Sequence, residues 1–406
     1  MSFFPALFSR ALTSRNYRIY FAGQLVSLAG TWMQQIAMSW LAYRLSNSAV
    51  VLGLIGFATQ IPILLLGSFG GVMSDRFDRR RLMMISQSLA MAQALLLAFL
   101  TWRGWVTVPW LVGLAFVLGC INALDIPTRQ AFSVQLVDRR EDLPNAIALN
   151  SLLMNATRFV GPTLAGFVLA AFGEEVCFLV NAASYLAVLL ALLAIKAPAR
   201  LAQAGSALAA LRDGFAYALS QRKIRGQLLV VATVSFLVTP YLVLMPLFAR
   251  EILGGDARVF GALVGSSGAG SLVASLYLAS RTSTERLQRR VFAAVMVTGA
   301  ALSLFAANRE LFLAFPIVMV MGASIILVIA GSNTLVQTEL HDAYRGRVMA
   351  IFSMAFLGVA PLGSLTVSAI AHSVGVPTTL VGCGLATMAV GFIAYRSLRS
   401  VGHGVP

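Results

Sequence analysis

Charged side chains are scarce in this chain. Asp, Glu, Lys and Arg together make up 11% of its 406 residues, and 59% of the residues are hydrophobic. Soluble domains have roughly a quarter of their residues charged, so this composition excludes a water-soluble globule. The apolar runs are continuous and do not alternate with a period of two, which favours membrane-spanning helices over a β-barrel.

Cysteine and histidine are also rare, with three of each. Cys120, Cys177 and Cys383 lie in apolar runs without paired spacing, so we expect small buried hydrophobic residues and neither a disulfide nor a metal site. The sequence offers no nucleophile–histidine pair and no Gly-x-x-x-x-Gly-Lys-Ser/Thr motif, which predicts neither an enzyme nor an ATPase. A metal exporter needs several acids, imidazoles or thiolates inside the membrane. We therefore expect no metal and no cofactor.

Apolar runs long enough to cross a bilayer, which takes about 20 residues, recur twelve times along the chain. They lie at 19–43, 48–73, 82–102, 108–131, 145–171, 175–196, 225–249, 258–280, 290–307, 311–333, 347–373 and 376–396. The sequence therefore predicts an all-α integral membrane protein of about twelve transmembrane helices.

The longest interior polar stretch separates these runs six and six. The expected units are an N-terminal six-helix bundle at 1–196, a cytoplasmic linker at 197–224 and a C-terminal six-helix bundle at 225–406. Within the linker, the segment from Ala207 to Leu219 has the pattern of an amphipathic helix on the membrane surface. Weakly similar segments begin at Gln135 and, 202 residues later, at Gln337, which favours two pseudo-symmetric halves.

The net charge of +15 is distributed unevenly over the expected loops. If the N-terminus is cytoplasmic, 24 of the 30 Lys and Arg residues fall on the inner side and Arg158 falls inside a span. The five on the outer side are Arg44, Arg103, Arg250, Arg258 and Arg309. By the positive-inside rule, both termini are expected in the cytoplasm. The positive net charge is thus explained by the orientation of the chain in the membrane, whose lipids it contacts. We expect no nucleic-acid partner.

One loop holds a dense charge cluster between two apolar runs. It reads Gly71-Val72-Met73-Ser74-Asp75-Arg76-Phe77-Asp78-Arg79-Arg80-Arg81. This loop resembles the Gly-x-x-x-Asp-Arg-x-Gly-Arg-Arg/Lys loop of the major facilitator superfamily. The matching residues are Gly71, Asp75, Arg76, Arg79 and Arg80. The family's second glycine is Asp78 here. The resemblance covers essentially the whole chain and implies a transporter built from two six-helix bundles.

Three further segments resemble narrower groups within that superfamily. Gly23-Gln24-x-x-Ser27-x-x-Gly30-x-Trp32, ending at Trp40-Leu41, and Asp125-x-Pro127-x-Arg129-Gln130-Ala131 resemble the bacterial exporter branch that includes enterobactin exporters and macrolide efflux proteins. Gly161-Pro162-Thr163-Leu164-Ala165-Gly166 resembles the Gly-Pro-x-x-Gly-Gly element of facilitator antiporters, with Ala165 replacing one glycine. We expect Gly161, Pro162 and Gly166 to give a helix bend or pivot, or else only close packing.

The charged loop has the pattern of a gating latch. Asp75 can accept backbone N–H groups at the N-terminus of a facing helix, expected to be span eleven. Arg79 can then pair with a carboxylate on span four, where Asp125 lies about 9 Å of helix rise from the inner end. The alternative is a solvated loop whose basic residues serve topology alone.

Charges at bilayer depth are costly and usually functional. Arg158 lies about 20 Å along span five. There its guanidinium can hold an anionic substrate group in a central cavity, or it can form a structural pair with Asp125 or bind backbone carbonyls. Asp125 is either a structural latch partner or, as a carboxyl that gains a proton when desolvated and unpaired, the carrier of a coupling proton.

Polar side chains on span one complete the expected cavity lining. They are Gln24, Ser27, Thr31, Gln34 and Gln35, which recur at helical spacing, with Trp32 on the adjoining face. Asn122, Asn155 and Asn333 extend this lining from other spans. Polar groups that face lipid are penalised, so this stripe faces either the cavity or neighbouring helices to which it hydrogen-bonds.

Together these patterns predict a secondary-active exporter of a small organic solute, siderophore-like or drug-like, with an anionic group as one option. We expect alternating access coupled to proton antiport, in a multi-pass monomer of the bacterial inner membrane. Two alternatives stay open. One is a lysophospholipid transporter of the same fold, which needs a lateral opening between helices. The other is a membrane sensor that binds solute without net transport.

Overall fold

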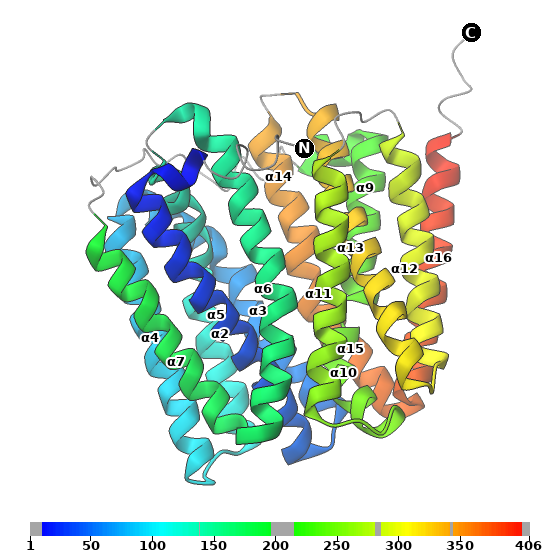
Figure 1. Ribbon diagram of the computed structural model, residues 1–406. Helices are drawn as coiled ribbons and strands as arrows, with labels where there is room; N and C mark the ends of the chain where they lie inside the picture. The colour runs from blue at the N-terminus through cyan, green and yellow to red at the C-terminus, as the bar shows by residue number, and fades with distance from the viewer. Residues whose placement is uncertain (1–9, 138, 196–214, 281–285, 342–343, 400–406) are drawn as a thin grey trace, which may run out of the picture.

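The computed structural model of the chain describes residues 10–137, 139–195, 215–280, 286–341 and 344–399. Nearly all of these residues are helical, and the described ranges contain no strand. The first half of the molecule has six long helices (Figure 1). They are α2 (Arg15–Ser46), α3 (Ala49–Arg76), α4 (Arg79–Trp102), α5 (Val108–Gln135), α6 (Leu143–Phe172) and α7 (Glu174–Ala194), with a single turn η1 (Arg140–Asp142) before α6.

The second half also crosses the fold six times, but two of these crossings are composite. The first consists of α9 (Arg222–Thr233), η2 (Val234–Val238), α10 (Tyr241–Leu247) and η3 (Phe248–Ile252). The other composite crossing consists of α14 (Arg345–Ser353), η5 (Met354–Gly358) and α15 (Val359–Val374). The remaining helices are α11 (Ala257–Ala279), α12 (Leu287–Ala307), α13 (Leu311–Glu339) and α16 (Val376–Arg399).

Eleven of the twelve crossings have the length and apolar composition of a membrane span. The exception is α2, which at 32 residues is long enough. It carries Gln24, Gln34 and Gln35, and these amides lower its mean hydropathy. The prediction of an all-α membrane protein of about twelve helices is therefore confirmed, with α2 as its polar member.

The two composite crossings contain π-helical segments. These are η2, η3 and η5, each of five residues. A π-helical turn adds a residue to the helix without ending it, and such turns are frequent at functional sites. The segment η2 packs against α15, so it lies where the two composite crossings meet. The segment η5 packs against α3, so it lies where the two halves meet.

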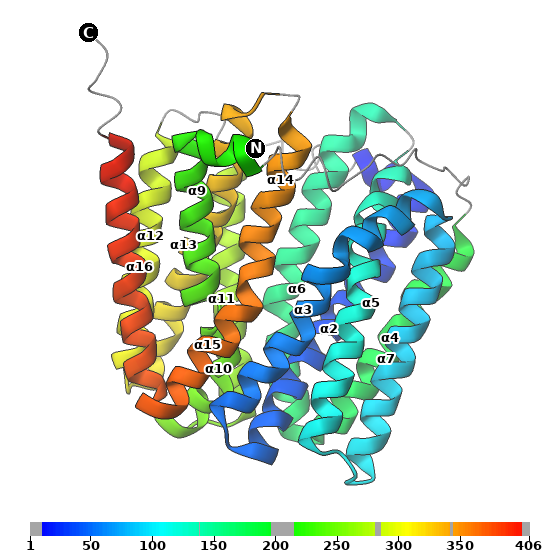
Figure 2. The ribbon, with the colours of Figure 1, turned by 180° about the vertical axis from the view of Figure 1, so that it is seen from behind.

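The two halves stand side by side as bundles with their helices roughly parallel to one axis (Figures 1 and 2). We call the end where α3 meets α4 and α13 approaches α14 the basic end, because Arg76, Arg79, Arg80 and Arg345 lie there. The other end is called the opposite end. Contacts between the halves are made chiefly by α6 with α11 and by α3 with α15.

Most of the expected linker at 197–224, including most of the expected amphipathic segment from Ala207 to Leu219, lies outside the described residues. Its last part is described: residues 215–220 are helical and pack on the second half. Ala218 is fully buried there, and the rings of Tyr217 and Tyr344 stack with 4.1 Å between their centroids. The end of the linker therefore packs against helices of the second half.

Candidate functional site

A cavity between the two halves lies toward the basic end. Its volume is about 540 Å³, and it is lined by α3 and α5 of the first half and by α14 and η5 of the second. Lining residues of different character are Leu64, Ile126, Gln130, Arg347, Ser353 and Met354. The far end of the lining is formed by Leu64 and Gly358, which touch: a Cβ on Gly358 would lie 2.5 Å from a methyl group of Leu64.

The opposite end is closed by contacts between the halves. The rings of Trp40 on α2 and Phe260 on α11 are stacked, with centroids 6.0 Å apart. Close by, the Tyr43 hydroxyl donates a hydrogen bond of 3.2 Å to the Glu251 carboxylate on η3. Aromatic stacking and a hydrogen bond to a carboxylate both favour the closed arrangement. The cavity therefore lies toward the basic end, and the two halves are in contact at the opposite end.

The seam between α6 and α11 contributes to this closure because glycines allow the two backbones to touch. A Cβ on Gly166 would lie 2.8 Å from the carbonyl oxygen of Ala257, and one on Gly261 would lie 2.5 Å from that of Pro162. A Cβ on Gly268 would meet the carbonyl oxygen of Arg158. A residue larger than glycine would force the helices apart at these points.

Arg158 lies in the middle of α6, fifteen residues after the helix begins at Leu143, which is about 22 Å of helix rise from the basic end. Its guanidinium carbon lies 5.7 Å from the centre of the Trp32 ring, a cation–π distance. Within the described parts of the chain, no carboxylate lies within ion-pair distance of it. The expected structural pair with Asp125 is therefore not formed in this conformation.

The surroundings of Arg158 come from both halves. Trp32 belongs to α2, whereas Tyr241, whose phenol is close enough to interact electrostatically with the guanidinium, begins α10. The Tyr241 hydroxyl shares a 2.6 Å hydrogen bond with the Ser267 hydroxyl of α11. Arg158 thus lies close to residues of both bundles, as do residues of the mid-membrane sites of transporters with this plan.

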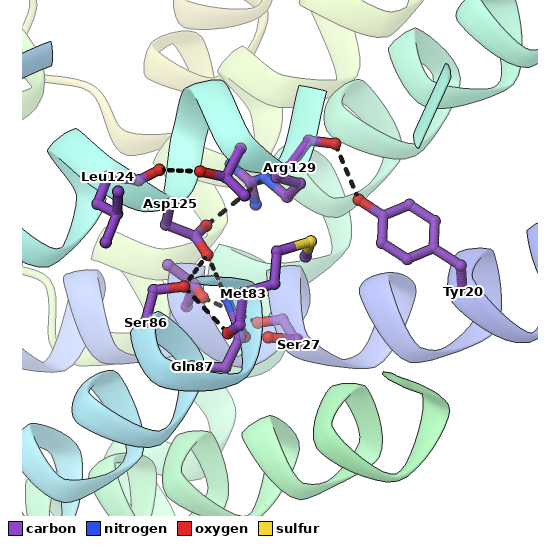
Figure 3. A network of polar contacts seen from close by, with 10 residues as sticks. Tyr20, Ser27, Met83, Ser86, Gln87, Leu124, Asp125 and Arg129 are labelled. Atoms are coloured by element: carbon purple, nitrogen blue, oxygen red, sulfur yellow. Dashed lines mark hydrogen bonds and ion pairs between the residues drawn. The ribbon is translucent and has the colours of Figure 1, made fainter. Parts of the chain in front are cut away.

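Asp125 lies inside the first half and is buried, on the side of α5 that faces α4 (Figure 3). Its Oδ1 accepts hydrogen bonds from the Ser86 hydroxyl at 2.8 Å and the Gln87 amide at 2.7 Å. Its Oδ2 is 3.8 Å from Nε of Arg129, one turn along α5. Tyr20 donates to the carbonyl oxygen of Arg129 at 3.3 Å. This network holds the carboxylate away from the cavity, although Ile126 and Gln130 of the same helix line it.

The charged loop differs from the expected latch. Arg79 pairs with Asp75 at 3.2 Å and donates to the Ser74 carbonyl, so the expected pairing of Arg79 with Asp125 is not made in this conformation. Asp75 itself is half exposed instead of capping span eleven. Arg80 donates to the carbonyl oxygens of Leu192 and Leu193 at the end of α7, at 2.6 and 3.1 Å. The reason is local: an i,i+4 partner is closer to Arg79 than any carboxylate on α5.

Two other residues of the loop have simple positions. Arg76 ends α3 and is exposed, and Gly71 has open space where a Cβ would point. Asp78, which replaces the family's second glycine, is the N-cap of α4: its carboxylate accepts a 2.8 Å hydrogen bond from the backbone N–H of Arg81. The departure from the family pattern therefore supplies a helix cap.

The polar stripe of α2 divides between several surroundings. Gln34 is buried inside the first half, where it donates to Gln93 of α4 at 2.9 Å and accepts from Asn181 of α7 at 2.7 Å. Gln24 and Ser27 are also buried, and Ser27 lies beside Gln87 in Figure 3. Gln34 thus corresponds to the alternative expectation, hydrogen bonding between neighbouring helices. The buried Gln24 does not, because its Nε2 has no hydrogen-bond partner among the described residues.

The other expected lining residues are only partly enclosed. Thr31 bonds to the Ser27 carbonyl of its own helix, Asn155 donates to the Ser151 carbonyl and Asn333 accepts from Gln337. Gln35 is exposed and Asn122 is half-buried. The cavity toward the basic end is instead lined by other residues, so the structure does not gather the expected polar residues into one site.

The expected bend in α6 takes a different form. The helix runs without interruption from Leu143 to Phe172, with Pro162 inside it. Gly161 faces α2, where a Cβ would lie 2.6 Å from that of Trp32, whereas Gly166 faces α11. Close packing on two sides is therefore what this conformation displays for these glycines.

Sequence reasoning missed Arg347 as a cavity residue. It lies in the first turn of α14, lines the cavity, and places its guanidinium carbon 5.7 Å from the centre of the Tyr344 ring. In the sequence it counts only as one of many basic residues on the inner side. The signal that could have identified Arg347 is its position at the start of the apolar run 347–373, where a basic residue lies at the edge of a span.

Comparison with known proteins assigns the chain to a protein family. The transmembrane secretion effector family matches residues 9–402. The staphyloferrin A transporter of Staphylococcus aureus (strain NCTC 8325 / PS 47) is 26% identical over 383 residues, which cover 93% of this chain and 95% of that protein. Macrolide efflux protein A of Streptococcus pyogenes is 22% identical, with 89% of this chain and 91% of that protein covered.

Solved structures share the fold at low sequence identity. A crystal structure of the nucleoside transporter NupG superposes with a TM-score of 0.73 at 13% identity, covering 95% of this chain and 99% of that one. A POT family transporter in complex with a thioalcohol-conjugated peptide gives a TM-score of 0.78 at 9% identity, covering 95% and 96% of the two chains. These likenesses show the fold alone. Together with the family match over residues 9–402, they show that the chain is a membrane transporter of the major facilitator type and belongs to the transmembrane secretion effector family.

Proposed function

We propose that this protein is a secondary-active exporter of a small organic solute, which works by alternating access across the bacterial cytoplasmic membrane. The observation that carries the proposal is the cavity of about 540 Å³ between two bundles that are in contact at the opposite end. A site of this kind, open to one side and closed to the other, is one of the two states that alternating access requires.

The orientation follows from charge. The basic end carries the dense arginine loops, and the positive-inside rule places such loops in the cytoplasm. With both termini cytoplasmic, the cavity opens inward, which is the state in which an exporter takes up its solute. The gating elements in this proposal are the residues of the charged loop at the inner end of the first half, which are Gly71, Asp75, Arg76, Arg79 and Arg80.

The solute site in this proposal is centred on Arg158 and Trp32. A guanidinium without a carboxylate partner at bilayer depth is costly, and a bound solute group would offset that cost. The ring of Trp32 offers a flat apolar surface beside it. The expected residues Asn155 and Asn333 are not part of this centre, since their described partners lie on their own helices.

Proton coupling is assigned to Asp125 in the same proposal. It is a buried carboxyl whose partners Ser86, Gln87 and Arg129 all lie in the first half, so rearrangement of α4 against α5 would change its hydrogen bonds directly. A change in the contact of Asp125 with Arg129 is the step to which we assign proton exchange.

A specific feature supports a second candidate, a lysophospholipid transporter. An apolar groove of about 670 Å³ lies between α2, α6 and α7 and is lined by residues such as Leu25, Val160 and Val180, which are 44%, 42% and 41% exposed. The sequence alternative required a lateral opening of this type. The groove is separated from Arg158 by the contact of Trp32 with Gly161, so a lipid path would need these two residues to part.

The test uses a deletion strain, the complemented strain and strains carrying Arg158→Ala or, as a control, Arg81→Ala, grown under iron limitation. Small molecules are quantified in cells and medium. The proposal expects at least one organic solute to accumulate in deletion and Arg158→Ala cells and to leave wild-type and Arg81→Ala cells. Unchanged profiles, together with no flux in inside-out vesicles, would favour a sensor. Selective movement of lysophospholipid would support the second candidate.

A further inference from the structure

Aromatic side chains are concentrated around one turn at the opposite end. Three of the five tryptophans of the chain lie within nine residues there: Trp102 ends α4, Trp105 lies in the turn and Trp110 lies in the first turn of α5. Trp102 is 69% exposed and Trp105 is 55% exposed, and the ring of Phe99 contacts both of theirs. Tryptophan is enriched at membrane–water interfaces, where its ring lies at the level of the lipid headgroups. The turn therefore has the composition of an interfacial segment.

The length of α4 places this turn at a membrane interface. The helix runs from Arg79 to Trp102, which is 24 residues, or about 36 Å. The hydrocarbon core of a bilayer is about 30 Å thick. With the Arg79 end at one interface, the Trp102 end therefore reaches the other. The turn lies where α4 meets α5 at the opposite end (Figures 1 and 2).

The backbone holds the turn in one shape. The N–H of Trp105 donates to the carbonyl oxygen of Leu100 at 2.9 Å, and the N–H of Gly104 donates to that of Thr101 at 3.0 Å. Gly104 has a φ of +68°, so these two bonds form a Schellman motif, the helix end that a left-handed residue allows. The exposed side chains of the turn are therefore presented from a fixed backbone.

Arg103 lies between the two exposed rings of this turn. Its guanidinium carbon is 4.8 Å from the centre of the Trp105 ring and 5.9 Å from that of the Trp102 ring, both cation–π distances. Among the residues that the structure describes, no carboxylate lies within ion-pair distance of Arg103. The charge is thus placed by aromatic rings and not by an acid.

Other arginines at this end have partners in the protein itself. Arg44 pairs with Glu174 at 2.8 Å, and Arg309 donates to the carbonyl oxygens of Ala306 and Asn308. A guanidinium on an aromatic ring keeps its N–H groups for a phosphate, which it can bind in bidentate geometry. The exposed Arg103 has the setting for a partner outside the protein.

We propose that the turn of Trp102, Arg103 and Trp105 binds one anionic phospholipid, with Arg103 on its phosphate and the two rings against its glycerol and upper acyl chains. A lipid suits this surface because a cation among exposed tryptophans lies at the depth of lipid headgroups. An anionic lipid is favoured because a zwitterionic headgroup brings its own cation next to Arg103. In the orientation proposed above, this lipid belongs to the outer leaflet. The inference does not depend on which solute the protein carries.

The test measures lipid binding to the purified full-length protein, freed of lipid in detergent, by native mass spectrometry. The probes are dioleoyl phosphatidylglycerol and dioleoyl phosphatidylcholine, which share their acyl chains and differ in headgroup charge. The variants are Arg103→Gln and Arg103→Lys. Arg309→Gln is the matched control, since Arg309 is exposed at the same end and bonds to carbonyls of its own loop.

Wild type and Arg309→Gln are expected to bind one phosphatidylglycerol about tenfold more tightly than phosphatidylcholine, the difference that one charge-assisted contact supplies. The two lipids should bind alike in Arg103→Gln. Arg103→Lys should keep part of the preference, because the charge remains and the bidentate geometry is lost. No preference in wild type, or an undiminished preference in Arg103→Gln, would overturn the proposal.

A second measurement locates the lipid. Phosphatidylglycerol with bromine atoms in its upper acyl chains quenches nearby tryptophans, and the quenched fraction of the emission should fall in the double variant Trp102→Phe with Trp105→Phe. An unchanged fraction would contradict binding at this turn. Displacement of the lipid by excess inorganic phosphate would assign the site to a free anion, and a dimer lost in Arg103→Gln would assign the surface to a second copy of the chain. Either result would overturn the lipid site.

Discussion

Asp125 and Arg129 lie one turn apart on α5, with 3.8 Å between Oδ2 of the carboxylate and Nε of the guanidinium. The separation is longer than that of a charge-assisted hydrogen bond, which is about 2.8 Å. The other oxygen of Asp125 instead has two short partners on α4, Ser86 and Gln87. The side-chain partners of the carboxylate on α4 are therefore closer than its partner Arg129 on α5. Movement of α4 relative to α5 would break the two hydrogen bonds to Ser86 and Gln87.

Substitution of Asp125 by Asn tests its role in coupling. The amide can still accept from Ser86 and Gln87, so the first half is expected to fold, but it cannot take up a proton. In inside-out vesicles we expect uptake driven by an imposed pH gradient to be lost while downhill exchange of solute continues.

The matched control for that substitution is Ser86→Ala, which removes one hydrogen bond to the carboxylate and keeps the titratable group. Coupling should survive in Ser86→Ala. Undiminished pH-driven uptake in Asp125→Asn would exclude Asp125 as the proton carrier and leave it as a structural tie between α4 and α5.

Substitution of Gly268 by Ala tests the seam between α6 and α11. The added methyl group meets the Arg158 carbonyl oxygen, so the backbones must separate, at a cost of about 1–3 kcal/mol for the closed opposite end. The seam can be followed in a cysteine-free background with Ala257→Cys as reporter, because Ala257 is 5% exposed and faces Gly166. Labelling by an impermeant maleimide added from outside is expected to accelerate.

The control is Gly382→Ala on α16, where no atom lies within 4 Å of the new methyl group. It should leave the labelling rate of the reporter unchanged. Equal labelling rates of the reporter with Gly268 and with Gly268→Ala would mean that α6 and α11 accommodate the methyl group without opening the opposite end.

Replacement of Tyr43 by Phe removes the hydrogen bond to Glu251 that joins the halves at the opposite end. A hydrogen bond to a charged group that is partly solvated contributes about 1 kcal/mol, so the equilibrium should shift roughly fivefold toward opening. The same Ala257→Cys reporter measures the shift. Glu251→Gln, which keeps an acceptor oxygen, should change the labelling rate less than Tyr43→Phe, and the reverse order would point to charge and not to the hydrogen bond.

The sequence predicts the helices well because each apolar run is a local property of the chain. Run length and turn residues are sufficient for the number of spans. The asymmetry of Lys and Arg predicts their direction. Arg158 is noticed for a similar reason, since a charge inside an apolar run stands out without knowledge of its neighbours. The π-helical segments at 234–238, 248–252 and 354–358 have no comparable local pattern.

Side-chain partners are less predictable because they depend on how each helix is rotated. Gln34 and its partners Gln93 and Asn181 are 59 and 147 residues apart in sequence, and no spacing rule connects them. The predicted partnership of Arg79 and Asp125 names two helices that are neighbours, and Asp125 does face α4. In this conformation, however, its partners on α4 are Ser86 and Gln87, and Arg79 pairs with Asp75. The cavity role of Arg347 depends on how the second half is placed against α3 and α5, which the sequence of either half alone does not reveal.

Arg80 provides the most direct test of the loop as a structural element. Its guanidinium donates to the carbonyl oxygens of Leu192 and Leu193, which end α7 and have no later turn of helix to bind them. A positive charge at a helix C-terminus also interacts favourably with the helix dipole. Arg80→Ala is therefore expected to destabilise the protein by about 1–2 kcal/mol, seen as a lower Tm in detergent. Arg81→Ala is the matched control, because the Arg81 side chain is exposed and its hydrogen bond to Asp78 is donated by the backbone N–H, which alanine keeps. If both variants melt together with wild type, the loop serves topology alone; if only Arg80→Ala melts earlier, the loop also fastens α4 to α7.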